Sequence, residues 1–203
     1  MTTGFSDLGE YATAPRVGGL RLSPDGSWLA LAVQTVGGTP PRYLTSIWRL
    51  DTAPGAEPVR LTRSAEGEGS PEFLPDGSLV FVSKRPDGSA TAGPDKTAAE
   101  DKPALWLLPA GGGEARRIAA PGGGVAGVAV ARDAGTLVWS APVFRGTAIG
   151  EQDAAVRKAR TDAGVAAILH EAGSIRYWDH DLSAEQPRLL IASEGKAIRR
   201  FVN

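Results

Sequence analysis

Few residues of this chain are of the types that carry out covalent catalysis, and their spacing does not favour it. A serine hydrolase needs its nucleophile on a sharp turn, commonly in a Gly-x-Ser-x-Gly setting. Ser193 comes nearest to this setting because Gly195 follows two residues later, but Ile191 occupies the upstream glycine position. The residues around Ser193 are typical of a strand end and a turn. Ser193 is therefore not predicted to be a nucleophile.

The two histidines of the chain are His170 and His180. His170 falls near the end of a predicted helix, where a ring that can carry positive charge suits the helix dipole. Asp179, His180 and Asp181 have the side chains of a metal site. On a strand, however, the two aspartates point to one face and the histidine to the other. A hydrogen-bonded strand end is therefore favoured over a metal site.

The remaining candidate motifs are also better explained by structure than by chemistry. The glycine clusters at 111–113 and 122–124 precede strand-like segments, and no Gly-Lys-Ser/Thr follows them, so we interpret them as turns and not as phosphate loops. The chain has no cysteine, which excludes disulfides and thiol nucleophiles. The sequence predicts no catalytic residue, no metal ligand and no cofactor-binding residue. The tryptophans fall mostly inside predicted strands, where core packing is favoured over a ligand platform; they are Trp28, Trp48, Trp106, Trp139 and Trp178.

Charge and hydropathy exclude further classes of partner. The 22 basic and 23 acidic residues are mixed along the chain and give a net charge of −1. Without a basic stripe to neutralise phosphates, nucleic acid is not an expected partner. No basic region followed by an apolar run opens the chain, and no apolar stretch approaches the ~20 residues of a membrane helix. We expect a cytoplasmic protein that has no membrane contact.

Three stretches repeat one pattern, in which an apolar alternating run, a tight turn and a second apolar run follow one another. They span residues 20–33, 71–82 and 128–139. Pro24-Asp25-Gly26 and Pro75-Asp76-Gly77 lie 51 residues apart, and Arg132-Asp133 takes the same place in the third stretch. Proline presets the first turn position, aspartate bonds back to the backbone, and glycine takes the left-handed conformation. Strands and turns at a period of about 40–50 residues are typical of propeller blades.

The repeats predict an all-β fold, a partial β-propeller of about three four-stranded antiparallel blades within residues 1–203. Blade 1 is expected over about 17–65, blade 2 over about 68–121 and blade 3 over about 124–197. In blade 1 the third and fourth strands are expected at 43–50 and 58–62, and in blade 2 at 104–108 and 115–119. The polar segment 85–103 is expected to be a surface loop because it has too few large apolar groups to order itself.

Blade 3 carries the one expected helical insertion, at 151–172. It has acidic residues in its first turn, an alanine-rich middle and Gly173 as a stop, and Gly164 is expected to kink or divide it. The strand pattern resumes at 175–179 and again at 187–192. Residues 198–203 are expected to begin a fourth blade.

The segments 22–26, 70–77 and 105–118, together with the insert and the Arg176–Asp181 segment after it, resemble the N-terminal propeller of prolyl oligopeptidase-type serine peptidases. The resemblance is nearest to the acylaminoacyl-peptidase and dipeptidyl-peptidase-like bacterial branch and covers essentially the whole chain. Members of that family place an α/β-hydrolase domain with Ser, Asp and His after the propeller. No position of this chain corresponds to those catalytic residues.

The resemblance implies a non-catalytic propeller fragment, which would gate the access of peptides to the active site of a full-length enzyme and would not be an enzyme on its own. The alternative is a stand-alone propeller-like module that binds a protein partner. A row of three blades would leave an apolar face open on its first and last blades. Self-association, or a partner chain bound through those faces, is therefore expected.

Overall fold

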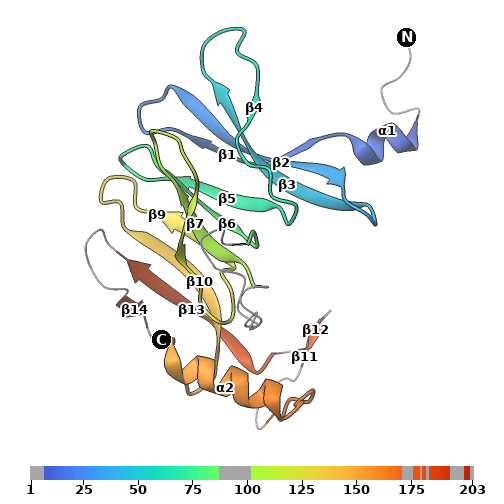
Figure 1. The fold of residues 1–203 in the computed structure, drawn as a ribbon, viewed down its shortest axis with the longest axis vertical. Coiled ribbons are helices and arrows are strands. Elements are labelled where there is room, and N and C mark those ends of the chain that lie inside the picture. The colour runs from blue at the N-terminus through green and yellow to red at the C-terminus, as the bar shows by residue number, and fades with distance from the viewer. Residues whose placement is uncertain are drawn as a thin grey trace.

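The computed structural model describes residues 7–86, 102–170, 176–178, 180–181, 183–192 and 199–201. Most regular elements in these ranges are strands, which form three four-stranded antiparallel sheets and one two-stranded ribbon, so the expected all-β class is confirmed. Figure 1 shows the three sheets following one another in chain order, with the longer helix below the third. Among the described residues, no helix is long and apolar enough to cross a membrane.

Sheets 1 and 2 each use four strands in simple chain order. Sheet 1 consists of β1 (Arg16–Leu22), β2 (Trp28–Gly37), β3 (Arg42–Asp51) and β4 (Val59–Arg60). Sheet 2 consists of β5 (Glu68–Phe73), β6 (Leu79–Ser83), β7 (Ala104–Leu108) and β8 (Arg116–Ala119). The expected strand 104–108 is found with the same bounds as β7. Most of the expected loop 85–103 lies outside the described residues.

Sheet 3 differs from the expectation because its strands are not consecutive. It consists of β9 (Gly127–Val130), β10 (Leu137–Phe144), β13 (Glu185–Ala192) and β14 (Arg199–Phe201). A strand lies within the expected range 175–179, but it does not belong to this sheet: among the described residues, β11 (Arg176–Tyr177) pairs with β12 (His180–Asp181) as a separate ribbon. Residues 199–201 do not begin another unit, because β14 pairs with β13 at the edge of this sheet. The chain thus leaves the sheet after β10 and returns to it only at β13.

Two helices are present in the described residues. The expected insert 151–172 is shorter than predicted: α2 spans Glu151–Asp162 and is followed by Gly164 at φ +60°. Helix formation stops there because this left-handed conformation favours glycine and does not continue a right-handed helix. The short helix α1 (Leu8–Thr13) was not expected, and the Asp7 side chain caps it by accepting a hydrogen bond from the Gly9 N–H.

The repeated turns join the first and second strands of each sheet. In the first turn, Asp25 accepts hydrogen bonds from the Ser23 hydroxyl at 2.6 Å and the Ser27 N–H at 3.0 Å. These bonds, led by that from Ser23, lower the pKa of Asp25 to about 2 because they favour the ionised carboxylate. Asp76 makes the same bond to the Ser78 N–H in the second turn. The turn chemistry of the sequence prediction is therefore present in the structure.

The sheets pack face to face, and their first strands lie side by side. One core cluster joins Ala30 and Ile47 of sheet 1 to Phe81 and Trp106 of sheet 2. A second cluster, which includes Val80, Leu105, Trp139 and Leu190, joins sheet 2 to sheet 3. Strand β1 contacts β5, and β5 contacts β9.

An ion pair also links the first strands of sheets 1 and 2. Arg21 on β1 and Glu72 on β5 are 2.7 Å apart, and the hydrogen bond to Glu72 raises the pKa of Arg21. The equivalent hairpins of successive sheets are therefore neighbours in space as well as repeats in sequence.

Candidate functional site

A cleft of about 540 Å³ opens where the junction of sheets 1 and 2 meets the solvent. The segment 61–65 between β4 and β5 forms one wall, and residues 113–115 before β8 form the other. Leu108 lies on the floor, where it packs against the core between the sheets. Arg63, Arg85 and Glu114 also line the cleft, so apolar side chains and charges of both signs face the same space.

A chain of hydrogen bonds around Glu68 holds the wall 61–65 in place. The Ile47 N–H donates to the Thr62 Oγ1 at 2.8 Å, and the Thr62 hydroxyl donates to the Glu68 Oε2 at 3.0 Å. The Ser64 N–H donates to the Glu68 Oε1 at 2.9 Å. Glu68 itself is only 2% exposed. One buried carboxylate thus ties β3 to the segment between the first two sheets.

Burial raises the pKa of Glu68 because the ionised carboxylate loses its hydration, and this effect exceeds the opposing effect of its hydrogen bonds from Ser64 and Thr62. The positive charges of Arg85 and Arg60 also oppose the rise. A carboxyl group whose pKa is higher in the folded than in the unfolded protein stabilises the fold most when it is protonated. That contribution is complete below the ordinary pKa and is lost as the pH rises through the folded value.

Replacing Glu68 by glutamine should therefore change how stability depends on pH. Glutamine carries no charge at any pH, so the free energy of unfolding of Glu68→Gln should rise relative to wild type as the pH increases from about 4 to about 7. Urea denaturation at a series of pH values measures this difference. The same substitution at Glu66, which is exposed, is the matched control for the removal of a carboxylate from this segment. If the difference in the free energy of unfolding between Glu68→Gln and wild type stays constant with pH, the Glu68 carboxyl group has the same pKa in the folded and the unfolded protein.

Arg85 is positioned by the residues of sheet 2. Its N–H donates to the Ser83 Oγ at 3.0 Å, and its guanidinium lies 5.1 Å from the ring centre of Trp106. Trp106 is in turn fixed by its indole N–H, which donates to the Ser83 carbonyl at 3.2 Å. The negative face of the ring attracts the guanidinium cation and so helps to hold it there. Among the described lining residues, the Thr62 hydroxyl is hydrogen-bonded to the buried Glu68 carboxylate, where it holds the segment 61–65 in place.

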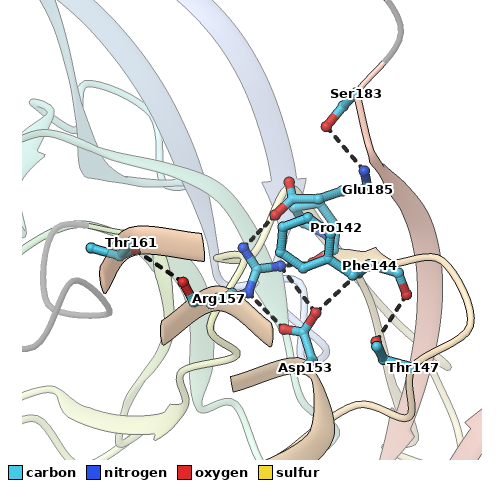
Figure 2. A network of polar contacts seen from close by, with 8 residues as sticks. All are labelled: Pro142, Phe144, Thr147, Asp153, Arg157, Thr161, Ser183 and Glu185. Carbon is cyan, nitrogen blue, oxygen red and sulfur yellow. Dashed lines mark hydrogen bonds and ion pairs between the residues drawn. The ribbon is translucent and has the colours of Figure 1, made fainter. Parts of the chain in front are cut away.

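A second polar cluster anchors α2 to sheet 3 (Figure 2). The Arg157 Nε donates to the Asp153 Oδ2 at 2.6 Å, and its Nη2 donates to the Pro142 carbonyl at 2.9 Å. The Arg157 Nη1 also pairs with the Glu185 carboxylate, and the Phe144 N–H donates to the Asp153 Oδ1 at 3.0 Å. The helix is therefore held to both β10 and β13 through one guanidinium.

Gly122 and Gly123 explain why this guanidinium fits. A Cβ on Gly123 would lie 2.0 Å from the Pro142 oxygen and 2.7 Å from the Arg157 Nη2. Gly124 has φ +85°, which also favours glycine. This segment was interpreted as a turn from the sequence. The structure adds that Gly122 and Gly123, which have no side chains, leave room for Arg157, the residue that anchors α2.

The candidate residues of the sequence analysis do not come together into a catalytic set. Ser193 and Asp179 lie outside the described residues, and of His180 and Asp181 only the backbone, in β12, is described. His170 was expected at a helix C-terminus, but α2 ends at Asp162, so this expectation was wrong. In the described ranges, no group of three His, Asp or Glu side chains could hold a metal ion.

Sequence reasoning missed both the buried Glu68 and the Arg157 anchor. The spacing of Asp153 and Arg157 by four residues on a predicted helix was a visible signal of an ion pair. Nothing in the sequence marked Glu185 or the Pro142 carbonyl as their partners, because both lie on strands distant along the chain.

Comparisons with known proteins give similarity at the level of the fold only. No family model matches the chain, and no curated protein matches its sequence. An acylaminoacyl peptidase of Pyrococcus horikoshii has a similar structure, with a TM-score of 0.57 at 10% identity over 93% of this chain and 25% of that one. AtxE2 isopeptidase with Astexin3-dC4 bound gives 0.52 at 13% identity over 94% of this chain and 31% of that one.

The apo form of AtxE2 isopeptidase gives a TM-score of 0.51 at 13% identity, over 90% of this chain and 28% of that one. The chain thus spans about a quarter to a third of the length of these peptidases. At such identities the likeness concerns the fold alone.

Proposed function

We propose that the three sheets are consecutive blades of a β-propeller. The observation that carries this proposal is the arrangement of the first strands, because β1 lies beside β5 and β5 beside β9 while each sheet packs its face on the next. Four-stranded antiparallel sheets placed radially, with their first strands toward a common axis, are the repeating unit of a propeller. The hairpin repeat of the sequence coincides with this unit.

The propeller serves as the non-catalytic wall of a prolyl oligopeptidase-type serine peptidase, where it admits short or unstructured peptides to the active site. Two observations support this role. The repeats and the insert resemble that family, and solved structures with a similar fold include an acylaminoacyl peptidase and an isopeptidase. The assembled enzyme binds and cleaves the peptide, and residues 1–203 restrict its access to the active site.

The purified 203-residue chain should hydrolyse no aminoacyl or acyl-peptide chromogenic substrate. Acyl transfer needs an activated nucleophile held beside a base, and the sequence offers no nucleophile elbow. Initial rates should equal those of a mock preparation from the same host, which controls for contaminating peptidases. Hydrolysis above that background that a serine-directed phosphonate abolishes would contradict the proposal.

Sequencing the transcript beyond codon 203 tests the proposed role more directly. A reading frame that continues into further four-stranded units and a Gly-x-Ser-x-Gly segment is the expected result. The enzyme encoded by that frame can then be assayed with peptides of graded length, with and without residues 1–203. Loss of the preference for short peptides on removal of these residues is expected. An unchanged preference would contradict the gating role.

A further inference from the structure

Two guanidinium groups in the cleft between sheets 1 and 2 have no acceptor among the described residues. Arg63 is exposed on the wall 61–65, and Arg85 is half-buried against the Trp106 ring. No described carbonyl or carboxylate accepts a hydrogen bond from either of these two side chains. Several other arginines pair with a described carboxylate, namely Arg21, Arg42, Arg49 and Arg157. The cleft therefore holds donors that suit the carboxylate of a ligand.

Apolar side chains line the same cleft. Leu61, Leu108 and Ala115 pack against the core cluster between sheets 1 and 2, and each is only partly buried. An aliphatic group placed over them would remove their remaining apolar surface from water. The ligand that fits this cleft therefore carries an aliphatic group as well as a carboxylate.

Glu114 adds a negative charge on the wall opposite Arg63. It is exposed, and none of the described cations pairs with it. A carboxylate in this position attracts an ammonium group. The cleft thus presents cationic, apolar and anionic groups to one ligand, which complement the carboxylate, the aliphatic side chains and the ammonium of a short peptide.

The wall that carries Arg63 is held in place by the protein itself. Thr62 is 5% exposed and Glu68 2% exposed, and their hydrogen bonds tie Thr62 and Ser64 to β3 and β5. Arg85 is positioned by the bond from its backbone N–H to the Ser83 hydroxyl. A wall that is already ordered loses little conformational freedom when a ligand binds.

The cleft lies away from the first strands of the sheets. Its lining comes from the segment between β4 and β5, from the residues that follow β6 and from the residues between β7 and β8, with the last residue of β7. None of the described residues of β1, β5 or β9 lines it. In the proposed propeller the first strands face the common axis. The cleft is then on the outer side of the ring and not in the central channel.

We propose that this cleft is a peptide-binding site on the outer side of the sheets. A short peptide places its C-terminal carboxylate against Arg63 and Arg85, its aliphatic side chains on the apolar lining and its N-terminal ammonium toward Glu114. The volume of about 540 Å³ is within the range of pockets that bind small ligands. This binding goes beyond the proposed function, because it takes place apart from the channel through which substrates would pass.

Titration of the isotope-labelled 203-residue chain with leucyl-leucine, followed by the chemical shifts of its amides, measures both the affinity and the place of binding. The amides of Ser64 and Ala115 should shift and reach saturation. Leucyl-leucinamide lacks the carboxylate and should bind about tenfold more weakly, because two charge-assisted contacts are lost. Acetyl-leucyl-leucine lacks the ammonium and should bind about threefold more weakly, because its partner Glu114 is exposed.

Two substitutions identify which wall contacts which end of the peptide. Arg63→Gln should weaken leucyl-leucine binding about three- to tenfold and leave leucyl-leucinamide binding unchanged, because that ligand has no carboxylate to lose. Glu114→Gln should weaken leucyl-leucine binding about threefold and leave acetyl-leucyl-leucine binding unchanged. Arg132→Gln is the matched control, since Arg132 is exposed and lies outside the cleft, and it should bind all three ligands as wild type does.

The absence of saturable shifts, or saturable shifts confined to residues outside the cleft, would overturn this proposal. Equal affinities for leucyl-leucine and leucyl-leucinamide would also overturn it, as would an Arg63→Gln variant that binds all three ligands equally more weakly. Neither the assay for hydrolysis nor the reading frame depends on these outcomes. The proposed function is therefore tested separately.

Discussion

Replacing Arg157 by alanine should lower the free energy of unfolding by about 3–5 kcal/mol, the usual cost of removing one partner from a buried ion pair. The Asp153 side chain is only 5% exposed and that of Arg157 19% exposed, so the carboxylate would stay buried without its cation. The Pro142 carbonyl and the Glu185 carboxylate would lose the same partner. Urea denaturation followed by circular dichroism measures the loss.

Lys158→Ala is the matched control for this prediction, because Lys158 is the next residue on the same helix and also pairs with an aspartate four residues away. The side chains of Lys158 and Asp162 are 76% and 60% exposed, and an exposed pair contributes only about 0–1 kcal/mol. Equal losses for the two variants would mean that the buried anchor contributes no more to stability than the exposed pair does. A small loss for both would contradict the structural account of Figure 2.

Replacing Trp106 by alanine should cost a comparable amount, about 3–5 kcal/mol, because a large cavity would form in the core. Trp106 is 2% exposed and belongs to the cluster that joins sheets 1 and 2. The substitution also removes the ring beneath the Arg85 guanidinium. Thermal unfolding of the variant should therefore occur at a much lower temperature than that of wild type.

Trp178→Ala provides the comparison at the surface. Trp178 is fully exposed in the turn between β11 and β12, and a surface substitution changes stability by about 0.5 kcal/mol or less. If Trp106→Ala destabilises the protein no more than Trp178→Ala does, the Trp106 side chain does not stabilise the core between sheets 1 and 2.

The strands of sheets 1 and 2 could be predicted from the sequence because their signals are local. Alternating apolar residues set the strand faces, and the aspartates of the repeated turns bond to amides two residues later. These interactions need no knowledge of distant residues. The same reasoning located β7 at Ala104–Leu108 without error.

Sheet 3 could be predicted only in part because its pairing is not local. Residues 175–179 have the alternating pattern of a strand, but the strand that pairs with β10 is β13, over eight residue pairs. Side-chain alternation says which residues share a face and not which strand is the neighbour. The six-residue α1 was missed because so short a helix has little periodicity to detect.

The candidate site was mostly invisible in the sequence. Glu68 stands in a stretch rich in glycine and acidic residues, which is typical of an exposed turn. Its burial follows from the packing of sheet 1 on sheet 2, and its partners Thr62 and Ser64 precede it in the segment between them. A buried carboxylate of this kind is recognised only once the two sheets are in contact.

The measurement that tests the central claim most directly is an electron cryomicroscopy structure of the protein purified from the cells that produce it. The account predicts a closed ring in which sheets 1, 2 and 3 are adjacent blades, with β1, β5 and β9 toward the central channel and a hydrolase domain over one mouth. Sheets stacked without a common axis, or a closed ring with no hydrolase domain bound, would contradict it.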